Sequence, residues 1–234
     1  MLKHYQDLYL GSSSVPLAAP STLSKRKKPL KEIWESFKAL LYPPSCLLCH
    51  EPIFDLKWKV FCQECFKSFA RAEIGFEPYH DKWVRHLVFA FENEGSAAVM
   101  LAAFKTANRP YLAEGMGALM VLQWLDEGHF MPDLIVPVPS CPYQTLKRGY
   151  RPSLLLAEVV AKLLRRPLWK GLRQDLEGEL EIKGEKDLQD KQLLLVDDVL
   201  YTGNTLKKAT SLLLGGYPRA VDALIFSIQS DARV

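Results

Sequence analysis

The fold is decided by the stretch Leu193-Leu194-Leu195-Val196-Asp197-Asp198-Val199-Leu200-Tyr201-Thr202-Gly203-Asn204-Thr205. Its first four residues form an unbroken apolar run, which is typical of a parallel strand that is covered on both faces. Two acids follow at the carboxyl end of this strand, and a turn of small residues then leads into a helix. In open α/β sheets, ligands bind beyond the carboxyl ends of such strands. The stretch therefore predicts an α/β fold with a binding site at this point.

The turn also indicates the chemistry of the ligand. From Thr202 to Thr205 it offers successive backbone N–H groups and two hydroxyls, and the following helix adds the positive end of its dipole. Gly203 lets the backbone approach a phosphate closely. Asp197 and Asp198 would repel a phosphate, but they can accept hydrogen bonds from a ribose diol or hold a hydrated Mg²⁺. The pattern favours a sugar phosphate over the alternative, a core strand that merely ends in acids before a capped helix.

Two CxxC pairs predict a metal site near the N-terminus. The ligands would be Cys46, Cys49, Cys62 and Cys65, with twelve residues between the pairs. Four thiolates complete the tetrahedral shell that Zn²⁺ prefers, and a closed shell indicates a structural metal. The alternatives are a redox disulfide, which needs only one CxxC, and four buried thiols. His50 and His80 are substitute ligands that the site does not need.

The rest of the chain alternates strand and helix signals, which predicts a mostly parallel sheet flanked by helices. Further strands are expected at Arg85–Phe91, Asp133–Val138 and Ala220–Ile228. Helices are expected at Gly95–Phe104, Tyr111–Leu125, from Ser153 as N-cap to Arg165, and Thr205–Leu214. The charged segment Arg173–Gln192 is expected to be a mobile loop.

Composition divides the chain into four segments. We expect a flexible basic extension at 1–29, an amphipathic helix at 30–44, the four-cysteine module at 45–70 and the α/β domain at 80–234. The basic excess lies in the first 45 residues, which have a net charge of +4, whereas the remainder has a net charge of −1. A near-neutral remainder argues against DNA binding as the main activity, because DNA affinity depends largely on neutralising phosphates.

Sequence features also predict the compartment. No apolar run approaches the roughly 18 residues that span a bilayer. The N-terminus lacks the apolar core of a signal peptide. We therefore expect a cytoplasmic protein with no membrane span, whose five cysteines are reduced or metal-bound.

The opening stretch resembles the phosphoribosyl pyrophosphate (PRPP) motif of type I phosphoribosyltransferases. The resemblance implies a type I phosphoribosyltransferase-like fold and PRPP bound with Mg²⁺. It also implies that Asp197 and Asp198 face the ribose hydroxyls. The 5′-phosphate would be held by the loop residues Thr202, Gly203, Asn204 and Thr205.

The chain as a whole resembles the ComF/GntX family, in which a four-cysteine module precedes a phosphoribosyltransferase-like domain. The resemblance begins with Leu40-Leu41-Tyr42-Pro43-Pro44-Ser45-Cys46-Leu47-Leu48-Cys49 and covers about residues 38 to 228. Further matches are Ala103-Phe104-Lys105, Val136-Pro137-Val138-Pro139 and Arg148-Gly149-Tyr150. The family implies a role in DNA uptake and natural competence.

Three departures from the pattern bear on catalysis. Val138-Pro139-Ser140-Cys141 takes the place of the pyrophosphate loop, and Cys141 is expected to be a buried small residue. Lys147 and Arg148 either supply countercharge to pyrophosphate, as the catalytic candidates, or are ordinary surface cations. Arg151-Pro152 replaces the family's Asn-Gln, and the segment that forms a hood over the substrate in related enzymes is shorter here.

Two functions remain open at this stage. The first is a ComF-like protein that binds PRPP with Mg²⁺ and transfers phosphoribose to an unknown acceptor. The second is a non-catalytic PRPP or nucleotide sensor, or an adaptor, that acts with single-stranded DNA machinery in competence. The intact phosphate loop supports both, and the shortened hood favours the second.

Overall fold

The computed structural model describes residues 45–53, 61–62, 64–65, 84–107, 109–184 and 187–229. The chain divides into two units, Met1–Arg71 and Ala72–Val234. The expected extension at 1–29, the helix at 30–44 and His80 lie outside the described residues.

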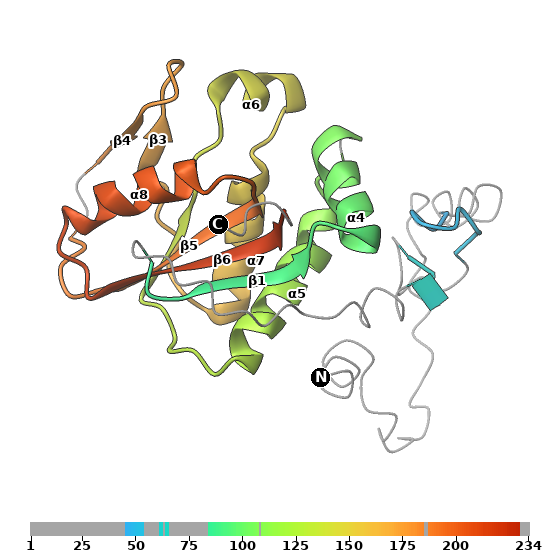
Figure 1. Ribbon diagram of the computed structural model, residues 1–234, viewed down its shortest axis with the longest axis horizontal. Helices are drawn as coiled ribbons and strands as arrows, with labels where there is room; N and C mark the ends of the chain where they lie inside the picture. The colour runs from blue at the N-terminus through green and yellow to red at the C-terminus, as the bar shows by residue number, and fades with distance from the viewer. Residues whose placement is uncertain are drawn as a thin grey trace, which may run out of the picture. The chain divides into compact units, whose positions relative to one another are not determined.

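A four-stranded parallel sheet forms the centre of the second unit (Figure 1). Its strands are β1 (Leu87–Glu92), β2 (Leu134–Pro137), β5 (Gln192–Leu200) and β6 (Ala220–Ile228), in the order β1-β6-β5-β2. The two central strands pair from Gln192 opposite Ala220 to Leu200 opposite Ile228. Because β5 is covered on both faces, the run from Leu193 to Val196 is fully buried, and the predicted parallel α/β sheet is confirmed.

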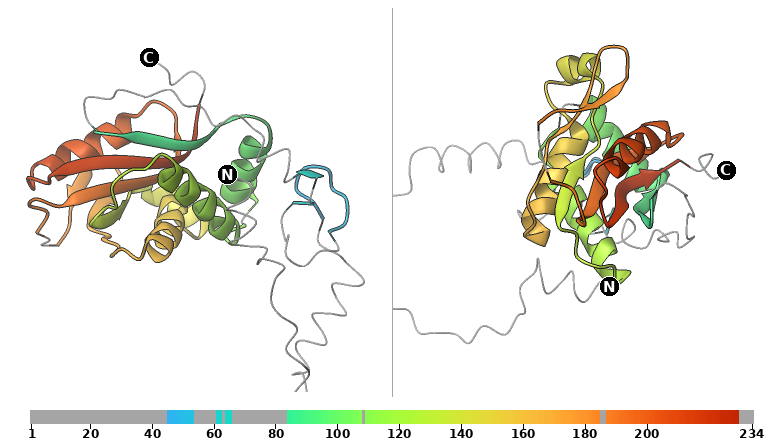
Figure 2. Two further views of the ribbon diagram at one scale, coloured as in Figure 1. Left: turned by 90° about the horizontal axis from the view of Figure 1, so that it is seen from below. Right: turned by 90° about the vertical axis from the view of Figure 1, so that its left-hand side faces the viewer.

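Helices cover both faces of this sheet (Figure 2). The helices of this unit are α4 (Gly95–Thr106), α5 (Leu112–Asp126), α6 (Pro142–Arg148), α7 (Pro152–Leu164) and α8 (Asn204–Leu214), of which α6 stands away from the sheet (Figure 1). Helices α5 and α7 pack together on one face, and α8 lies on the other. The two packed helices approach closely at Gly117, where an added Cβ would lie 2.6 Å from Cγ1 of Val159.

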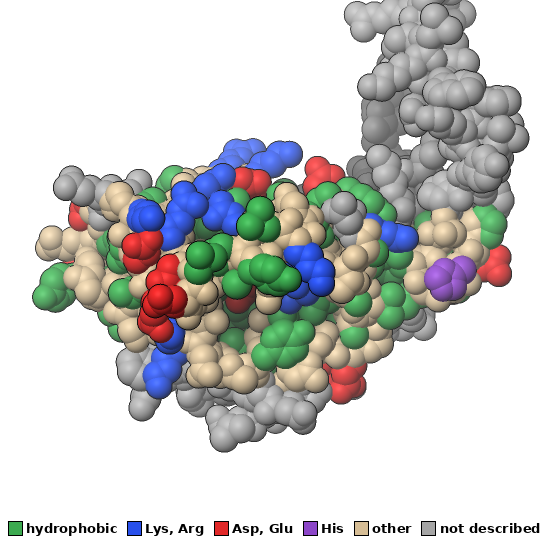
Figure 3. Space-filling view, turned by 90° about the horizontal axis from the view of Figure 1, so that it is seen from above, with side chains coloured by type: hydrophobic (Ala, Val, Ile, Leu, Met, Phe, Trp, Pro, Cys, Tyr) green, Lys and Arg blue, Asp and Glu red, His purple; other side chains and the backbone are tan. Residues whose placement is uncertain are grey.

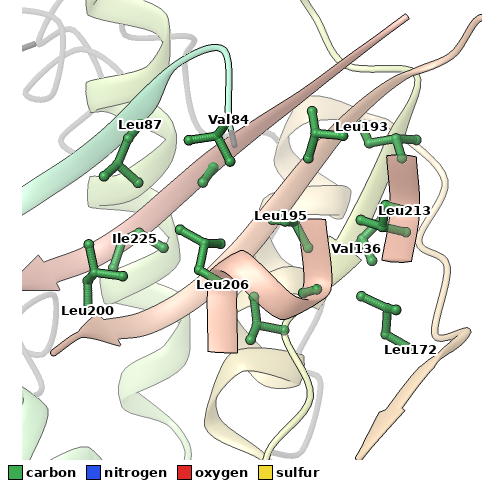
Figure 4. Close-up of a cluster of buried hydrophobic side chains, with 14 of the residues drawn as sticks. Val84, Leu87, Val136, Leu172, Leu193, Leu195, Leu200, Leu206, Leu213 and Ile225 are labelled. Atoms are coloured by element: carbon green, nitrogen blue, oxygen red, sulfur yellow. The ribbon is translucent and has the colours of Figure 1, made fainter. Parts of the chain in front are cut away.

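The core between the sheet and α8 is built from alternate strand residues (Figure 4). Leu193 and Leu195 of β5 contribute to this cluster together with Leu206 and Leu213 of α8. Side chains alternate across a strand, so their neighbours along β5 are buried on the opposite face of the sheet. The start of α8 is thereby anchored against the carboxyl half of β5, directly after the two acids.

The prediction of a mobile loop at Arg173–Gln192 is wrong in its first half. The structure has an antiparallel hairpin there, formed by β3 (Leu172–Gln174) and β4 (Leu180–Ile182). The turn is closed by Asp175, whose Oδ1 accepts hydrogen bonds from the backbone N–H groups of Glu177 (2.9 Å) and Glu179 (2.8 Å). Each strand has three residues, which is too short for the alternation of apolar and polar residues that would have indicated a strand in the sequence.

Within the described part of the chain, no helix combines the length and the apolar character needed to cross a membrane.

Candidate functional site

The two acids of the opening motif lie inside strand β5, which continues beyond them to Leu200. Each carboxylate has a different partner. Asp197 is half-buried and contacts α7, whereas Asp198 is buried and contacts α4. The sequence places these acids side by side, but the fold surrounds them with helices from distant parts of the chain.

Asp197 is held in place by two hydrogen bonds to the same oxygen. Its Oδ1 accepts from the Ser153 hydroxyl at 2.7 Å and from the backbone N–H of Asp198 at 2.8 Å. Burial and the neighbouring charge of Asp198 nevertheless raise the pKa of Asp197 to about 7. The carboxyl group therefore exchanges its proton near neutral pH, and a nearby cation would hold it ionised.

The prediction that Ser153 caps α7 is wrong. The residue that precedes the helix is Arg151, in an extended conformation, and Pro152 is the first helical residue. Proline suits that place because its missing N–H has no partner there in any case. Ser153 is left free to donate its hydroxyl to Asp197, a contact between residues 44 positions apart.

Asp198 forms an ion pair with Lys105, a residue whose role sequence reasoning missed. Lys105 Nζ lies 3.1 Å from Asp198 Oδ2, and the two side chains are only 15% and 9% exposed. The same ammonium lies 5.6 Å from the centroid of the Tyr201 ring, within the range of a cation–π contact. Lys105 was noted only within the Ala103-Phe104-Lys105 match, and nothing in its spacing pointed to the acids.

The predicted phosphate loop lies between β5 and α8, and its four residues are contiguous there. Gly203 has a φ of +71°, a backbone conformation that favours glycine, and α8 begins at the next residue. Thr202 and Asn204 are exposed, and Thr205 is half-buried. Gly203, the residue before α8, has no side chain with which to cap the first turn of this helix. The loop and the start of this helix therefore present backbone N–H groups toward solvent, as an anion site requires.

A cavity of about 600 Å³ lies between the end of α4 and helix α6. Its lining residues are Lys105, Thr106, Tyr143, Gln144, Lys147, Arg148 and Tyr150. Both catalytic candidates, Lys147 and Arg148, thus line the same cavity as Lys105. Lysine and arginine side chains lie among hydrophobic ones on the face of the molecule at the top of Figure 1 (Figure 3).

Tyr150 joins the two walls of this cavity. Helix α6 ends at Gly149, whose φ of +79° turns the chain. The Tyr150 hydroxyl then donates a hydrogen bond to the backbone carbonyl of Phe104 at the end of α4. Burial raises the pKa of Tyr150, which keeps the hydroxyl protonated as a donor.

Cys141, expected to be buried, is half-buried just before α6.

The four predicted metal ligands form a cluster in the first unit. The Sγ atoms of Cys46, Cys49, Cys62 and Cys65 all lie within 4.8 Å of one another, and none of these four described cysteines forms a disulfide. Cys49 Sγ and Cys62 Sγ are 3.7 Å apart. Zinc–sulfur bonds of about 2.3 Å in a tetrahedron place two sulfurs about 3.8 Å apart, so the cluster has the dimensions of a zinc site. The exposed side chain of His50 is not part of this group of four described ligands.

The electrostatics of the cluster also suit a metal. Burial opposes ionisation of Cys46, but backbone N–H donors and the Cys49 thiol lower its pKa to about 6. Burial and the other three cysteines raise the pKa of Cys65. Ionising one thiol thus disfavours ionisation of its neighbours, and a divalent cation removes that conflict because it binds all four as thiolates.

Comparison with known proteins defines the class of the domain. The family model for the phosphoribosyl transferase domain matches residues 157–228, a range that includes β5, the loop and α8. In sequence the chain is 25% identical over 139 residues to Competence protein F of Haemophilus influenzae. That match covers 50% of this chain and 61% of the relative, so less than two thirds of the relative's length is represented.

Two solved phosphoribosyltransferase structures are similar to part of this chain. A purine phosphoribosyltransferase from Pyrococcus horikoshii is 18% identical, with 49% of this chain and 71% of that one covered and a TM-score of 0.39. A hypoxanthine phosphoribosyltransferase from Staphylococcus aureus is 17% identical, with 52% and 65% covered and a TM-score of 0.37.

The chain carries a phosphoribosyltransferase-type domain with a parallel sheet flanked by helices, and a four-cysteine cluster precedes it in the sequence. The domain match, the similarity to Competence protein F and the cysteine cluster confirm the sequence-based resemblance to the ComF/GntX family.

Proposed function

We propose that this protein binds PRPP together with Mg²⁺ at the carboxyl end of β5. The observation that carries the proposal is the juxtaposition of Asp197 and Asp198 with a glycine turn and the uncapped start of α8. A ribose diol donates hydrogen bonds to the carboxylates, and the 5′-phosphate accepts them from the loop that begins at Thr202.

Mg²⁺ fits the acids as they stand. The pKa of Asp197 is raised by burial and by the charge of Asp198. The positive charge near the two carboxylates is therefore too small to keep both of them ionised at neutral pH. Hard oxygen ligands of this kind suit Mg²⁺, which usually binds one or two carboxylates together with substrate phosphates. In this proposal Asp198 or Asp197 holds the hydrated ion, which neutralises the pyrophosphate group. The cavity cations Lys147 and Arg148 add countercharge to the same group.

As an enzyme, the protein would transfer phosphoribose from PRPP to an unidentified acceptor. The carbon–oxygen bond to pyrophosphate breaks as the acceptor bond forms, and fixed cations stabilise the charge on the departing pyrophosphate. No proton donor is required for that departure, so the contribution of the protein is placement and charge.

A second candidate function, a non-catalytic PRPP or nucleotide sensor, is favoured by the hairpin β3–β4. Its strands are three residues each, and it occupies the segment that covers the substrate in related enzymes. Exclusion of water from the reacting centre depends on such a cover. Because the relative from Haemophilus is named for competence, we propose that either function serves DNA uptake, with single-stranded DNA machinery as the partner.

Calorimetric titration of PRPP with Mg²⁺ tests the site. Wild type should bind, and Asp198→Asn should weaken binding by about tenfold or more because it removes a charged acceptor of the ribose diol. Asp126→Asn, an exposed acid at the end of α5, is the matched control and should change nothing. Absence of binding by wild type would refute the proposal. Release of pyrophosphate with a panel of nucleobases then separates the enzyme from the sensor.

For the cysteine cluster we propose a structural zinc ion. The purified protein should contain about one zinc per chain, measured by mass spectrometry of the metal content. Replacing Cys46 and Cys62 by Ser should remove it, because a two-thiolate site binds zinc too weakly to survive purification. Cys141→Ser, outside the cluster, should keep the metal. A folded wild-type protein that holds no zinc would contradict this assignment.

A further inference from the structure

We infer that Lys105 changes its partner when PRPP binds. In the free protein it neutralises Asp198, and in the complex its ammonium group contacts the pyrophosphate group. This inference rests on the proposed function, because it assigns a role within the same site. It identifies a ligand-binding residue that the sequence motif does not contain. It also predicts that ligand binding at Asp198 and ligand binding in the cavity lined by Lys147 and Arg148 are energetically coupled.

The first argument concerns Asp198. Its side chain is 9% exposed, and an ionised carboxylate at that depth is costly without a partner of opposite charge. Lys105 supplies that partner at 3.1 Å. A ribose diol or Mg²⁺ must approach the same carboxylate, so the bound ligand competes directly with the ammonium group for it.

The second argument concerns the place to which Lys105 can move. Lys105 also lines the cavity that contains Lys147 and Arg148, so this one residue contacts both the cavity and Asp198. A lysine ammonium is a compact charge on a flexible four-carbon stem, and rotation of that stem carries it from Asp198 into the cavity. Three cations would then surround one pyrophosphate group, which carries several negative charges.

The third argument concerns what stays fixed. The backbone at the end of α4 is held by the hydrogen bond from Tyr150 to Phe104, one residue before Lys105. The ring of Tyr201 lies 5.6 Å from the ammonium at the entrance to the phosphate loop. Movement is therefore confined to the Lys105 side chain, and a cation–π contact with Tyr201 accompanies the position beside Asp198.

The exchange predicts an unusual result for pyrophosphate alone. Asp198→Asn frees Lys105 for the cavity, so this variant should bind inorganic pyrophosphate, measured by calorimetry in the presence of a chelator, more tightly than wild type. The same substitution in a Lys105→Met background should give a gain about fivefold smaller, a coupling of ordinary size between sites. The double variant removes both charges together, so it leaves no buried charge unpaired.

Mg²⁺ alone provides the reciprocal measurement. Lys105→Met removes the competitor from Asp198, and we expect Mg²⁺ to bind this variant about fivefold or more tightly than it binds wild type. Lys147→Met is the matched control: it deletes the same charge from the cavity, but Lys147 has no contact with Asp198. That control should weaken pyrophosphate binding and leave Mg²⁺ affinity within about twofold of wild type.

The outcomes separate this inference from the proposed function. Equal gains from Asp198→Asn in both backgrounds, or unchanged Mg²⁺ affinity in folded Lys105→Met, would overturn the exchange while PRPP binding by wild type still supported the site. Failure of wild type to bind PRPP would overturn the proposed function itself. Thermal unfolding of each variant establishes that the compared proteins are folded.

Discussion

Acidic side chains occupy both ends of the parallel sheet, and their surroundings differ. At the amino end of β6, Asp222 is completely buried. Arg85 donates to both of its oxygens (3.1 and 2.7 Å), His86 Nδ1 lies 3.0 Å from Oδ1, and Gln192 donates to Oδ2 at 3.0 Å. At the carboxyl end of β5, Asp197 accepts from the Ser153 hydroxyl and from the backbone N–H of Asp198, and Asp198 pairs with Lys105.

The comparison separates an acid that is fully surrounded by donors from the acid pair to which we assign the proposed ligand. Buried carboxylates are normally surrounded by donors, and Asp222 follows that rule with four contacts. The pair in β5 has fewer donors and mutual repulsion, which raises the pKa of Asp197 to about 7. When the negative charge of two acids is only partly neutralised in the folded protein, an added cation stabilises them strongly. The proposed Mg²⁺ and PRPP site requires such a pair.

The largest effect should come from Asp222→Ala. This substitution leaves Arg85 and Gln192 without the acceptor that they share, and we expect the free energy of unfolding to fall by about 3 kcal/mol. Denaturant unfolding measures it. Glu181→Ala, which breaks the exposed ion pair with Lys183, should cost less than about 1 kcal/mol. Equal losses for the two variants would remove the contrast between a structural acid and a surface acid.

A smaller effect is expected from the pH dependence that Asp197 confers. Its folded pKa of about 7 lies above the ordinary value of 3.8, so the folded state binds the proton more tightly than the unfolded state between these values. The contribution of this group to stability is therefore lost as pH rises from about 4 to about 7. Asp197→Asn cannot ionise, and the variant should gain about 1 kcal/mol or more relative to wild type between pH 5 and pH 8.

Thermal unfolding at the two pH values measures this difference. Asp126→Asn is again the exposed control and should track wild type across the range. If the unfolding temperatures of wild type and Asp197→Asn change with pH in the same way, the ionised carboxylate of Asp197 is stabilised as well as that of Asp222.

The smallest effect should come from Ser153→Ala. The serine hydroxyl lowers the pKa of Asp197 by stabilising its charged form, so its removal should raise that pKa further. The pH at which Mg²⁺ binding is half-maximal should then rise by about 0.5 to 1 unit. Calorimetric titration across pH 6 to 9 would detect it. Ser153→Thr keeps a hydroxyl and should restore the wild-type midpoint; a midpoint unmoved by Ser153→Ala would assign the serine a structural role alone.

Local patterns made much of the fold and site predictable. The apolar run of β5, the glycine turn and the spacing of four cysteines each specify structure over a few residues, and the resulting strand, loop and cluster are observed. The hairpin β3–β4 was missed because its three-residue strands are too short to show a hydrophobic alternation. Ser153 was assigned to a helix cap because the sequence shows its neighbours along the chain and not Asp197.

The sequence by itself determined the parallel sheet, the glycine turn and the four thiols, because the necessary groups are close together in the chain. The tertiary structure alone decided which charges meet. Ser153 reaches Asp197 across 44 positions, and Arg85 reaches Asp222 across 137. Lys105 likewise pairs with Asp198 only because α4 ends beside β5. Such pairs depend on how helices pack against the sheet, and no short stretch of sequence encodes that packing.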